Sequence, residues 1–479
     1  MSCLSILPDE VLKVIMQRIP LKERLGTCCL VSNRLRAAAV AATDCLDLES
    51  TFRTQQRVES GLEWIMKNGQ QLERLKLYNF RKPIQQLPCV NLLELQLCGR
   101  ECSVRLGPAA DGQLGVIQGC TKLTRLELYS SIKIIDAPEG AVLDGGLSNL
   151  VHLQHLAVTP YYYLAGLHNG TLPRLQHLTF LRVDCLSANN LLQLGRLPKL
   201  QELEFLASDD GVGPSSMPDF AFPASLTKLG MWSPVEAGVL SLVPKGLQAL
   251  QVGCDVQSPA EGPASLLHCV APLHELTWLS LLPHGDGMEW PPAGPAYSAI
   301  TASTGLVELE LVVNQLPPGV WPYVFPSSHK LPHLTCLNLD GDDILDYGVA
   351  GTSDASQRWG AADLSSLVSC CPSLCTIHTL ALQPGLHVSE LQKLTALTRL
   401  SVCWYSTDVA ECMMGLAAVT QLQSVTINLD IPRIPVASLL PLTSLTALTL
   451  LTCGLHKNHE DFVFGTSSLR ISTQVKVQV

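Results

Sequence analysis

One phrase recurs along most of this chain: a leucine, two variable residues, a second leucine, one variable residue and a third apolar residue. Early copies begin at Leu72 (LERLKL), Leu92 (LLELQL) and Leu123 (LTRLEL). With a degraded copy near Leu374, there are about fifteen copies, mostly spaced roughly 20 to 30 residues apart. The others begin at Leu153, Leu175, Leu200, Leu226, Leu247, Leu276, Leu306, Leu334, Leu397, Leu422 and Leu445. A short period predicts a stacked array, because each unit buries its leucines only against its neighbours.

Within each phrase the apolar residues alternate with variable ones. This alternation predicts a short strand whose leucines point inward while the residues between them point outward. The intervening segments, such as residues 389–397 (SELQKLTAL), carry leucines at three-residue steps suited to short helical turns. The phrase and its period are typical of leucine-rich repeats. The sequence therefore predicts an α/β solenoid with parallel strands on the concave face and short helices or loops on the convex face.

The first forty residues follow a helical spacing instead. Pro8, Asp9 and Glu10 form a good helix start, and Pro20 ends the element. Between them the apolar residues at helical steps are Val11, Leu12, Ile15, Met16 and Ile19. We expect a short second helix over residues 21–25 and a third over about 30–42. A helical unit of this size is marginal alone and needs a neighbour to cover its apolar faces.

The order and spacing of this start resemble the F-box family. The matching residues are Leu7 to Leu12 (LPDEVL), Ile15, Ile19-Pro20, Leu25 and residues 30–36 (LVSNRLR). The resemblance implies binding to the Skp-type adaptor of a cullin ubiquitin ligase, with contacts from Leu7, Pro8, Leu12, Ile15, Leu25 and Val31. Leu35 departs from the family, which usually has tryptophan there. Because that position mostly packs inward in the family, the departure bears on local stability more than on adaptor binding.

These patterns divide the chain into an F-box at residues 1–42 and a repeat array at 43–479, with a carboxy-terminal cap near 452–479. Residues 44–48 (DCLDL) predict an incomplete first strand that joins the two. We expect a substrate-recognition subunit of a Skp–cullin–F-box ubiquitin ligase, which recruits an unknown protein target through the array. The alternative is a repeat scaffold for protein interactions unrelated to ubiquitin, whose helical start only caps the array.

Aromatic side chains stand at outward strand positions or directly after strands. Such residues often dominate binding energy when they are desolvated. We expect target contacts from Tyr78, Tyr129, Tyr161, Tyr162, Trp232, Trp278, Trp404 and Tyr405. Each of them could instead pack on an adjacent loop and bind nothing.

Charge and composition argue against several other classes. The net charge is -10 and no cluster of lysine and arginine is present, so we expect no nucleic-acid partner. Asp9 and Glu10 fall where a signal peptide would be apolar, so the 18 cysteines are expected as reduced thiols in the cytoplasm, the nucleus or both. The charge-free run from Val436 to Leu455 has the length of a membrane span, but Pro441 interrupts it and it keeps the repeat period. We expect no membrane association.

Catalytic and metal-binding signatures are also missing from the sequence. The densest cysteine group, formed by Cys370, Cys371, Cys375 and His378, lacks the paired CxxC spacing of structural zinc sites. Cys45 lies between Asp44 and Asp47, which should raise the pKa of its thiol and oppose nucleophilic chemistry. We therefore expect a non-catalytic adaptor subunit with no cofactor, no metal and no catalytic residue.

Overall fold

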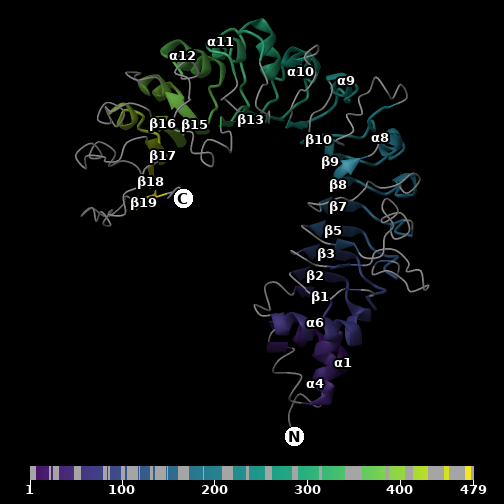
Figure 1. Cartoon of the computed structure of the whole chain (residues 1–479). Helices are drawn as coiled ribbons and strands as arrows, with labels where there is room; N and C mark the ends of the chain where they lie inside the picture. The colour runs from purple at the N-terminus through teal and green to yellow at the C-terminus, as the bar shows by residue number, and fades with distance from the viewer. Residues whose placement is uncertain are drawn as a thin grey trace. The chain divides into compact units, whose positions relative to one another are not determined.

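The structure is a computed structural model of the chain, shown in Figure 1. It describes residues 7–20, 23–24, 32–47, 55–78, 84, 87–98, 103–104, 117, 119–129, 133–134, 147, 149–159, 172–186, 188–207, 220–232, 237–253, 262–282, 290–311, 316–339, 359–382, 388–404, 414–429, 447–452 and 470–475. The chain forms two compact units, Met1–Leu226 and Thr227–Val479, which we call unit 1 and unit 2.

Unit 1 begins with two packed helices, α1 (Asp9–Arg18) and α4 (Asn33–Ala41). The acidic residues in the first turn of α1 favour its start, and the extended residue Ile19 followed by Pro20 ends it. Ser32 caps α4, because its side chain accepts a hydrogen bond from the Leu35 backbone N–H at 3.1 Å. The expected second helix, over residues 21–25, lies mostly outside the described residues.

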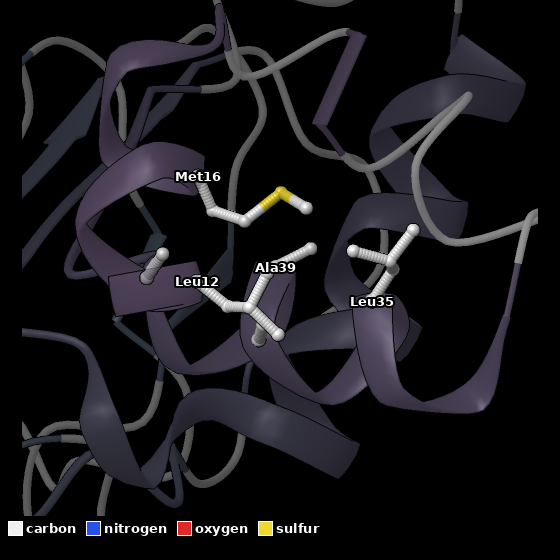
Figure 2. Packing of buried hydrophobic residues seen from close by; sticks show 6 residues of the cluster. Leu12, Met16, Leu35 and Ala39 are labelled. Carbon is white, nitrogen blue, oxygen red and sulfur yellow. The ribbon is translucent and has the colours of Figure 1, made fainter. Parts of the chain in front are cut away.

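The core between α1 and α4 is a small apolar cluster, shown in Figure 2. Its members are Leu12, Met16, Leu35, Ala38, Ala39 and Ala42. Leu12 and Ala39 are completely buried, and the alanines of α4 let the helices approach closely. Leu35 also packs inward, as expected, and fills with a smaller side chain the position that the F-box family usually gives to tryptophan.

Arg24 is a buried arginine that joins the ends of these helices. Its Nη2 donates to the carbonyl of Ile19 at 2.9 Å, and its Nη1 donates to the carbonyl of Ala42 at 2.8 Å. The side chain of Gln71 reaches back from the first repeat and donates from Nε2 to the carbonyl of Val40 at 2.5 Å. The Arg24 bonds give the carbonyls of Ile19 and Ala42 partners at the helix ends, and the Gln71 bond connects α4 to the first repeat.

The rest of unit 1 is built around one parallel sheet. Its strands in order are β1 (Cys45–Asp47), β2 (Arg74–Tyr78), β3 (Glu94–Cys98), β5 (Arg125–Tyr129), β7 (His155–Thr159), β8 (Phe180–Leu186) and β9 (Glu202–Ala207). The intervening elements are α6 (Gln55–Asn68), η3 (Gly69–Gln71), η4 (Leu172–Arg174), α8 (Ala188–Leu194) and the paired short strands β4 (Ser103–Val104) and β6 (Lys133–Ile134). β1 pairs with β2, so the expected incomplete first strand is confirmed.

The strands are aligned by their second leucines. Leu75, Leu95, Leu126 and Leu156 occupy one row of the sheet, and each is almost completely buried. A residue that alternates with them therefore lies on the opposite face of the sheet. This alternation confirms the repeat register for these strands.

The register is wrong for one copy. The phrase expected at Leu175 would place Phe180 inward, but the register pairs Leu181 with Leu156 and Phe180 with His155. The working phrase therefore starts three residues later, at Leu178, and Phe180 stands on the outer face. Both phrases fit the sequence, but Leu175 lies between η4 and a turn, and the strand begins only at Phe180.

Unit 2 repeats the same architecture. Its parallel strands in order are β10 (Lys228–Met231), β11 (Ala249–Val252), β12 (Trp278–Leu281), β13 (Glu308–Leu311), β14 (Cys336–Asn338), β15 (Thr376–Leu382), β16 (Arg399–Trp404), β17 (Ser424–Leu429), β18 (Ala447–Thr452) and β19 (Arg470–Val475). The helical elements are α9 (Ala237–Leu240), α10 (Gly262–Val270), η6 (Pro295–Thr301), α11 (Trp321–Val324), α12 (Ala361–Cys370) and η10 (Val388–Lys393). In Figure 1, α10, α11 and α12 lie on the side away from the sheet.

The end of the chain differs from the expectation in one respect. Within the interval 452–479, expected as a cap, β19 pairs in parallel with β18 and adds a further strand. The described part of the run from Val436 to Leu455 is β18 itself. Among the helices that the structure describes, none has the length and apolar character needed to cross a bilayer.

Candidate functional site

Helix α1 carries a second apolar face beside the one that packs on α4. Val11, Val14 and Ile15 lie three and four residues apart, so they form one stripe along the helix. Their exposed fractions are 42%, 58% and 37%. Leu12 and Met16 point instead into the α1–α4 core. A helix with a covered apolar face and an exposed one is suited to dock a partner.

The residues expected to contact an adaptor fall into different environments. Pro8 and Ile15 are exposed, and Leu7 is half-buried against the α1–α4 core. Leu12 is completely buried, so its role is core packing rather than the adaptor contact expected for it. Leu25 and Val31 lie outside the described residues. Val11 and Val14 share the exposed stripe with Ile15 but were not among the expected residues, because the sequence shows their helical spacing and not which face α4 covers.

Arg34 holds the start of α1 in place. Its Nε and Nη2 donate to Asp9 Oδ1 at 2.9 Å and 2.8 Å, and Nη2 also donates to the carbonyl of Leu7. Both side chains are exposed, so the ion pair contributes little to stability. Its effect is positional, because it fixes the backbone around Pro8 next to the exposed stripe.

The outward face of the unit 1 sheet carries a charged network. Arg125 and Glu127 project from β5, and Arg125 Nε donates to Glu127 Oε1 at 2.7 Å. His155 of β7 places its Nε2 3.1 Å from the same oxygen, an ion-pair distance without good hydrogen-bond geometry. The ring of His155 stacks on Phe180 of β8, with centroids 4.0 Å apart. Glu127 is thus nearly buried between cationic or polar neighbours.

Glu127 has a strongly lowered pKa. Burial acts to raise it, but the interactions with His155 and Arg125 outweigh burial and lower the pKa from 4.5 to about 2. The neighbouring Tyr129 shows the opposite effect, because burial and then the charge of Glu127 raise the pKa of its hydroxyl. Glu127 is therefore a permanent anion at neutral pH, and its charge is used inside the network.

A second pair completes the network. Arg182 of β8 donates from Nε to Oε2 of Glu204 on β9 at 2.6 Å, and its Nη2 contacts the same carboxylate. Glu204 is nearly buried. Both nearly buried carboxylates of this face are therefore matched by an arginine. In each pair the charge of the carboxylate is offset by that of an arginine.

The outward face of the unit 2 sheet has a different composition. Trp278 and Ser280 lie on β12, and Glu308 and Glu310 lie beside them on β13. Glu310 accepts hydrogen bonds from Ser280 Oγ at 2.7 Å and from Asn338 Nδ2 at 2.9 Å. These donors are neutral, so they orient the carboxylate without cancelling its charge.

The described aromatic residues expected to bind a target lie in both units. Tyr78 and Tyr129 are half-buried and align at one edge of the unit 1 sheet, two strands apart with Cys98 between them. In unit 2, Trp278 is half-buried on the sheet and Trp232 is exposed just after β10. Trp404 ends β16, but its side chain is not among those described, and Tyr161, Tyr162 and Tyr405 lie outside the described residues. Sequence reasoning did not select His155, Phe180 or Arg182, which lie on the outward face of the unit 1 sheet.

The pKa shifts of Cys45 and Cys371 follow from burial and from neighbouring groups. Burial, followed by the charges of Asp44 and Asp47, raises the pKa of Cys45, in the expected direction. Cys371 is completely buried, and its hydrogen bond with Cys370 together with burial raises its pKa. Across the described part of the chain, no group of three or more histidine, cysteine or acidic residues is placed to hold a metal ion.

The F-box domain model matches residues 4–40, which include α1 and most of α4. No curated protein matches the chain. Similar solved structures include an internalin of Listeria monocytogenes, with 13% identity over 84% of this chain and 95% of that one and a TM-score of 0.39. A leucine-rich-repeat protein of Leptospira interrogans is 16% identical over 78% of this chain and 86% of its own, with a TM-score of 0.38. Those scores are low, and the assignment of the repeats rests on the strand register itself.

The aligned leucines, the parallel sheet and the helical elements between the strands define leucine-rich repeats. They follow the segment matched as an F-box domain. The chain therefore combines a segment that matches the F-box domain model with an array of leucine-rich repeats.

Proposed function

We propose that this chain is a substrate receptor of a Skp–cullin–F-box ubiquitin ligase. Its F-box would bind a Skp-type adaptor and through it a cullin, and its repeats would bind a target protein. The observation that carries this proposal is the exposed stripe of Val11, Val14 and Ile15, which lies within the segment matched as an F-box.

The stripe supports docking because its exposure is costly without a partner. Covering apolar side chains removes surface from water, at about 25 cal/mol per Å² of apolar area. The other face of α1 already packs on α4, so α1 is not exposed merely because the unit lacks a core. A helical start that only capped the array would gain nothing from apolar residues at these positions.

The mechanism is recruitment rather than chemistry. A target held on the repeats would keep one of its lysines near the ubiquitin thioester of a partner enzyme, which makes transfer effectively intramolecular. The bond from Gln71 to Val40 supports this role, because it fastens α4 to the first repeat, while the Arg24 bonds hold the ends of α1 and α4 together. The chain itself would supply binding and positioning, and the partners would supply the reactive groups.

We also propose that the protein works in the cytoplasm, the nucleus or both. Among the described residues, Cys45, Cys89, Cys336, Cys370, Cys371 and Cys375 are free thiols, the state that a reducing compartment maintains.

The proposal is tested by co-purifying the full chain with a Skp-type adaptor. In the test variant, Val14→Glu places a charge in the middle of the stripe, and adaptor binding should fall at least tenfold. In the matched control, Gln17→Glu makes the same charge change at an exposed position of α1 beside the stripe, and binding should change less than twofold. Glutamate is a good helix former, so neither change should unfold α1.

Loss of binding only in Val14→Glu would support the ubiquitin-ligase role. If the intact, folded chain binds no adaptor, or if both variants bind like the parent, the proposal fails. The chain would then be the alternative, a repeat scaffold whose helical start is a cap.

A further inference from the structure

A sheet face of unit 2 shows a tryptophan and two carboxylates without a cationic partner among the described residues. We define the acidic tryptophan face as Trp278, Glu308 and Glu310. Trp278 and Glu308 are register partners on adjacent strands, and Glu310 lies two residues along β13 on the same face. From the geometry of these residues we infer that this face binds an arginine side chain of a target protein.

Charge supports a cationic occupant. In unit 1 the sheet-face carboxylates Glu127 and Glu204 are each paired with an arginine. Glu308 is exposed, and Glu310 receives hydrogen bonds from Ser280 and Asn338, which carry no charge. Among the described residues, therefore, no cationic side chain offsets the negative charge of this face.

The nearest cations in the same row are too distant to neutralise it. The row runs from Lys228 through Ala249, Trp278, Glu308, Cys336 and Thr376 to Arg399. Lys228 and Arg399 are each three strands from Glu308, which is roughly 14 Å at the usual strand spacing. Salt screens charges at that range, because the Debye length is about 8 Å at physiological ionic strength. The exposed His378 is two strands from Glu310 in the neighbouring row.

The aromatic ring selects the kind of cation. A cation over the face of tryptophan is attracted by the ring, and guanidinium groups also stack on it. Arginine presents a planar fork that can meet carboxylate oxygens while it stacks, whereas lysine presents a compact and strongly hydrated charge. Because the neutral donors hold Glu310 in place, its carboxylate is already oriented for such a fork. The tryptophan ring and the oriented carboxylate together favour a guanidinium group.

This inference rests on the proposed function for the identity of the partner as a ligase target. Binding itself can be measured on the full chain by titrating N-acetyl-arginine amide at constant ionic strength. The readout is the indole N–H signal of Trp278 in the NMR spectrum, assigned with Trp278→Phe. We expect a saturable shift in the millimolar range, and no comparable shift with N-acetyl-citrulline amide, which is neutral and nearly the same shape.

Two double variants distinguish the effect of these two carboxylates from the effect of the chain's net charge. Glu308→Gln/Glu310→Gln should weaken the arginine response at least tenfold, because hydrogen bonds to charged groups are lost. Glu63→Gln/Glu73→Gln makes the same charge change at exposed positions of unit 1 and should leave the response unchanged. The other indole signals report whether each variant is folded. N-acetyl-lysine amide should bind about two- to fivefold more weakly than the arginine probe.

An equal response to citrulline, an equal response to lysine, or an unchanged response in Glu308→Gln/Glu310→Gln would overturn the inference. Adaptor binding is measured on the same preparations, because it depends on α1. A chain that binds the adaptor but gives no arginine response loses only the inference. If the chain gives the arginine response but binds no adaptor, the arginine-binding inference holds and the proposed ligase function fails.

Discussion

Glu127→Gln tests the charged network of unit 1, because it removes the charge and keeps the shape. Glu127 is nearly buried, and its pKa falls from 4.5 to about 2 through its contacts with His155 and Arg125. One pKa unit corresponds to about 1.4 kcal/mol, so the full difference would be about 3 kcal/mol. Half of Arg125 is exposed to water, which screens the pair, so we expect a loss of about 2 kcal/mol at pH 7.

The assay is hydrogen exchange of backbone amides in β5 and β7, read by mass spectrometry on the full chain. A loss of about 2 kcal/mol in local opening free energy should speed their exchange about 30-fold. Peptides from β11 in unit 2 give an internal reference. Glu73→Gln, at an exposed position before β2, is the matched control and should change exchange less than twofold.

The pH dependence has a defined sign. Because the pKa of Glu127 is lower in the folded chain than in the unfolded one, its contribution is complete above about pH 5 and is lost as the pH falls toward 2. The difference between the parent and Glu127→Gln should therefore shrink to about half at pH 3. An equal difference at pH 7 and pH 3 would refute the electrostatic origin, and no difference at pH 7 would refute the stabilising role of the network.

Two further results are expected. Leu12→Ala should lower the free energy of unfolding of the helical unit by about 2 to 5 kcal/mol, because the side chain is completely buried, and residues 9–18 should lose protection from hydrogen exchange. Ile15→Ala, at an exposed position, should cost less than about 1 kcal/mol. Equal costs would contradict the assignment of faces on α1. Burial raises the pKa of Cys89 to about 12 and that of Cys120 to about 11. Iodoacetamide at pH 8 should then alkylate them at least 100-fold more slowly in the native chain than in the denatured one, as measured by peptide mass spectrometry, and similar rates would show that the thiols are accessible.

The repeat register was largely predictable from the sequence, because each strand is short and its leucines alternate with polar residues. Phe180 shows the limit of that reasoning. Two overlapping phrases, starting at Leu175 and Leu178, satisfy the same pattern, and only the alignment of Leu181 with Leu156 distinguishes them. A shift of three residues moves a side chain to the other face, so the error turned an outward residue into an expected core residue.

The helical start shows the same limit of reasoning from the sequence alone. The spacing of apolar residues predicted α1, but this helix carries apolar residues on two of its faces. Which face was core depended on α4, since the covering of Leu12 and Met16 left Val11, Val14 and Ile15 exposed. A periodic pattern identifies a helix, whereas its neighbours determine which residues a partner can reach.

The sequence by itself determined the two kinds of structure in this chain, a short helical start and a parallel array of leucine-rich repeats. Both follow from local periodicity, which is a property of neighbouring residues. The tertiary structure alone decided which charged side chains on each sheet face are paired with an opposite charge. Arg182 and Glu204 meet across adjacent strands although they are 22 positions apart in the sequence, while Glu310 accepts hydrogen bonds from the neutral side chains of Ser280 and Asn338. Cross-strand pairing brings distant residues together, so the partner of a charge could be identified only once the strands were aligned.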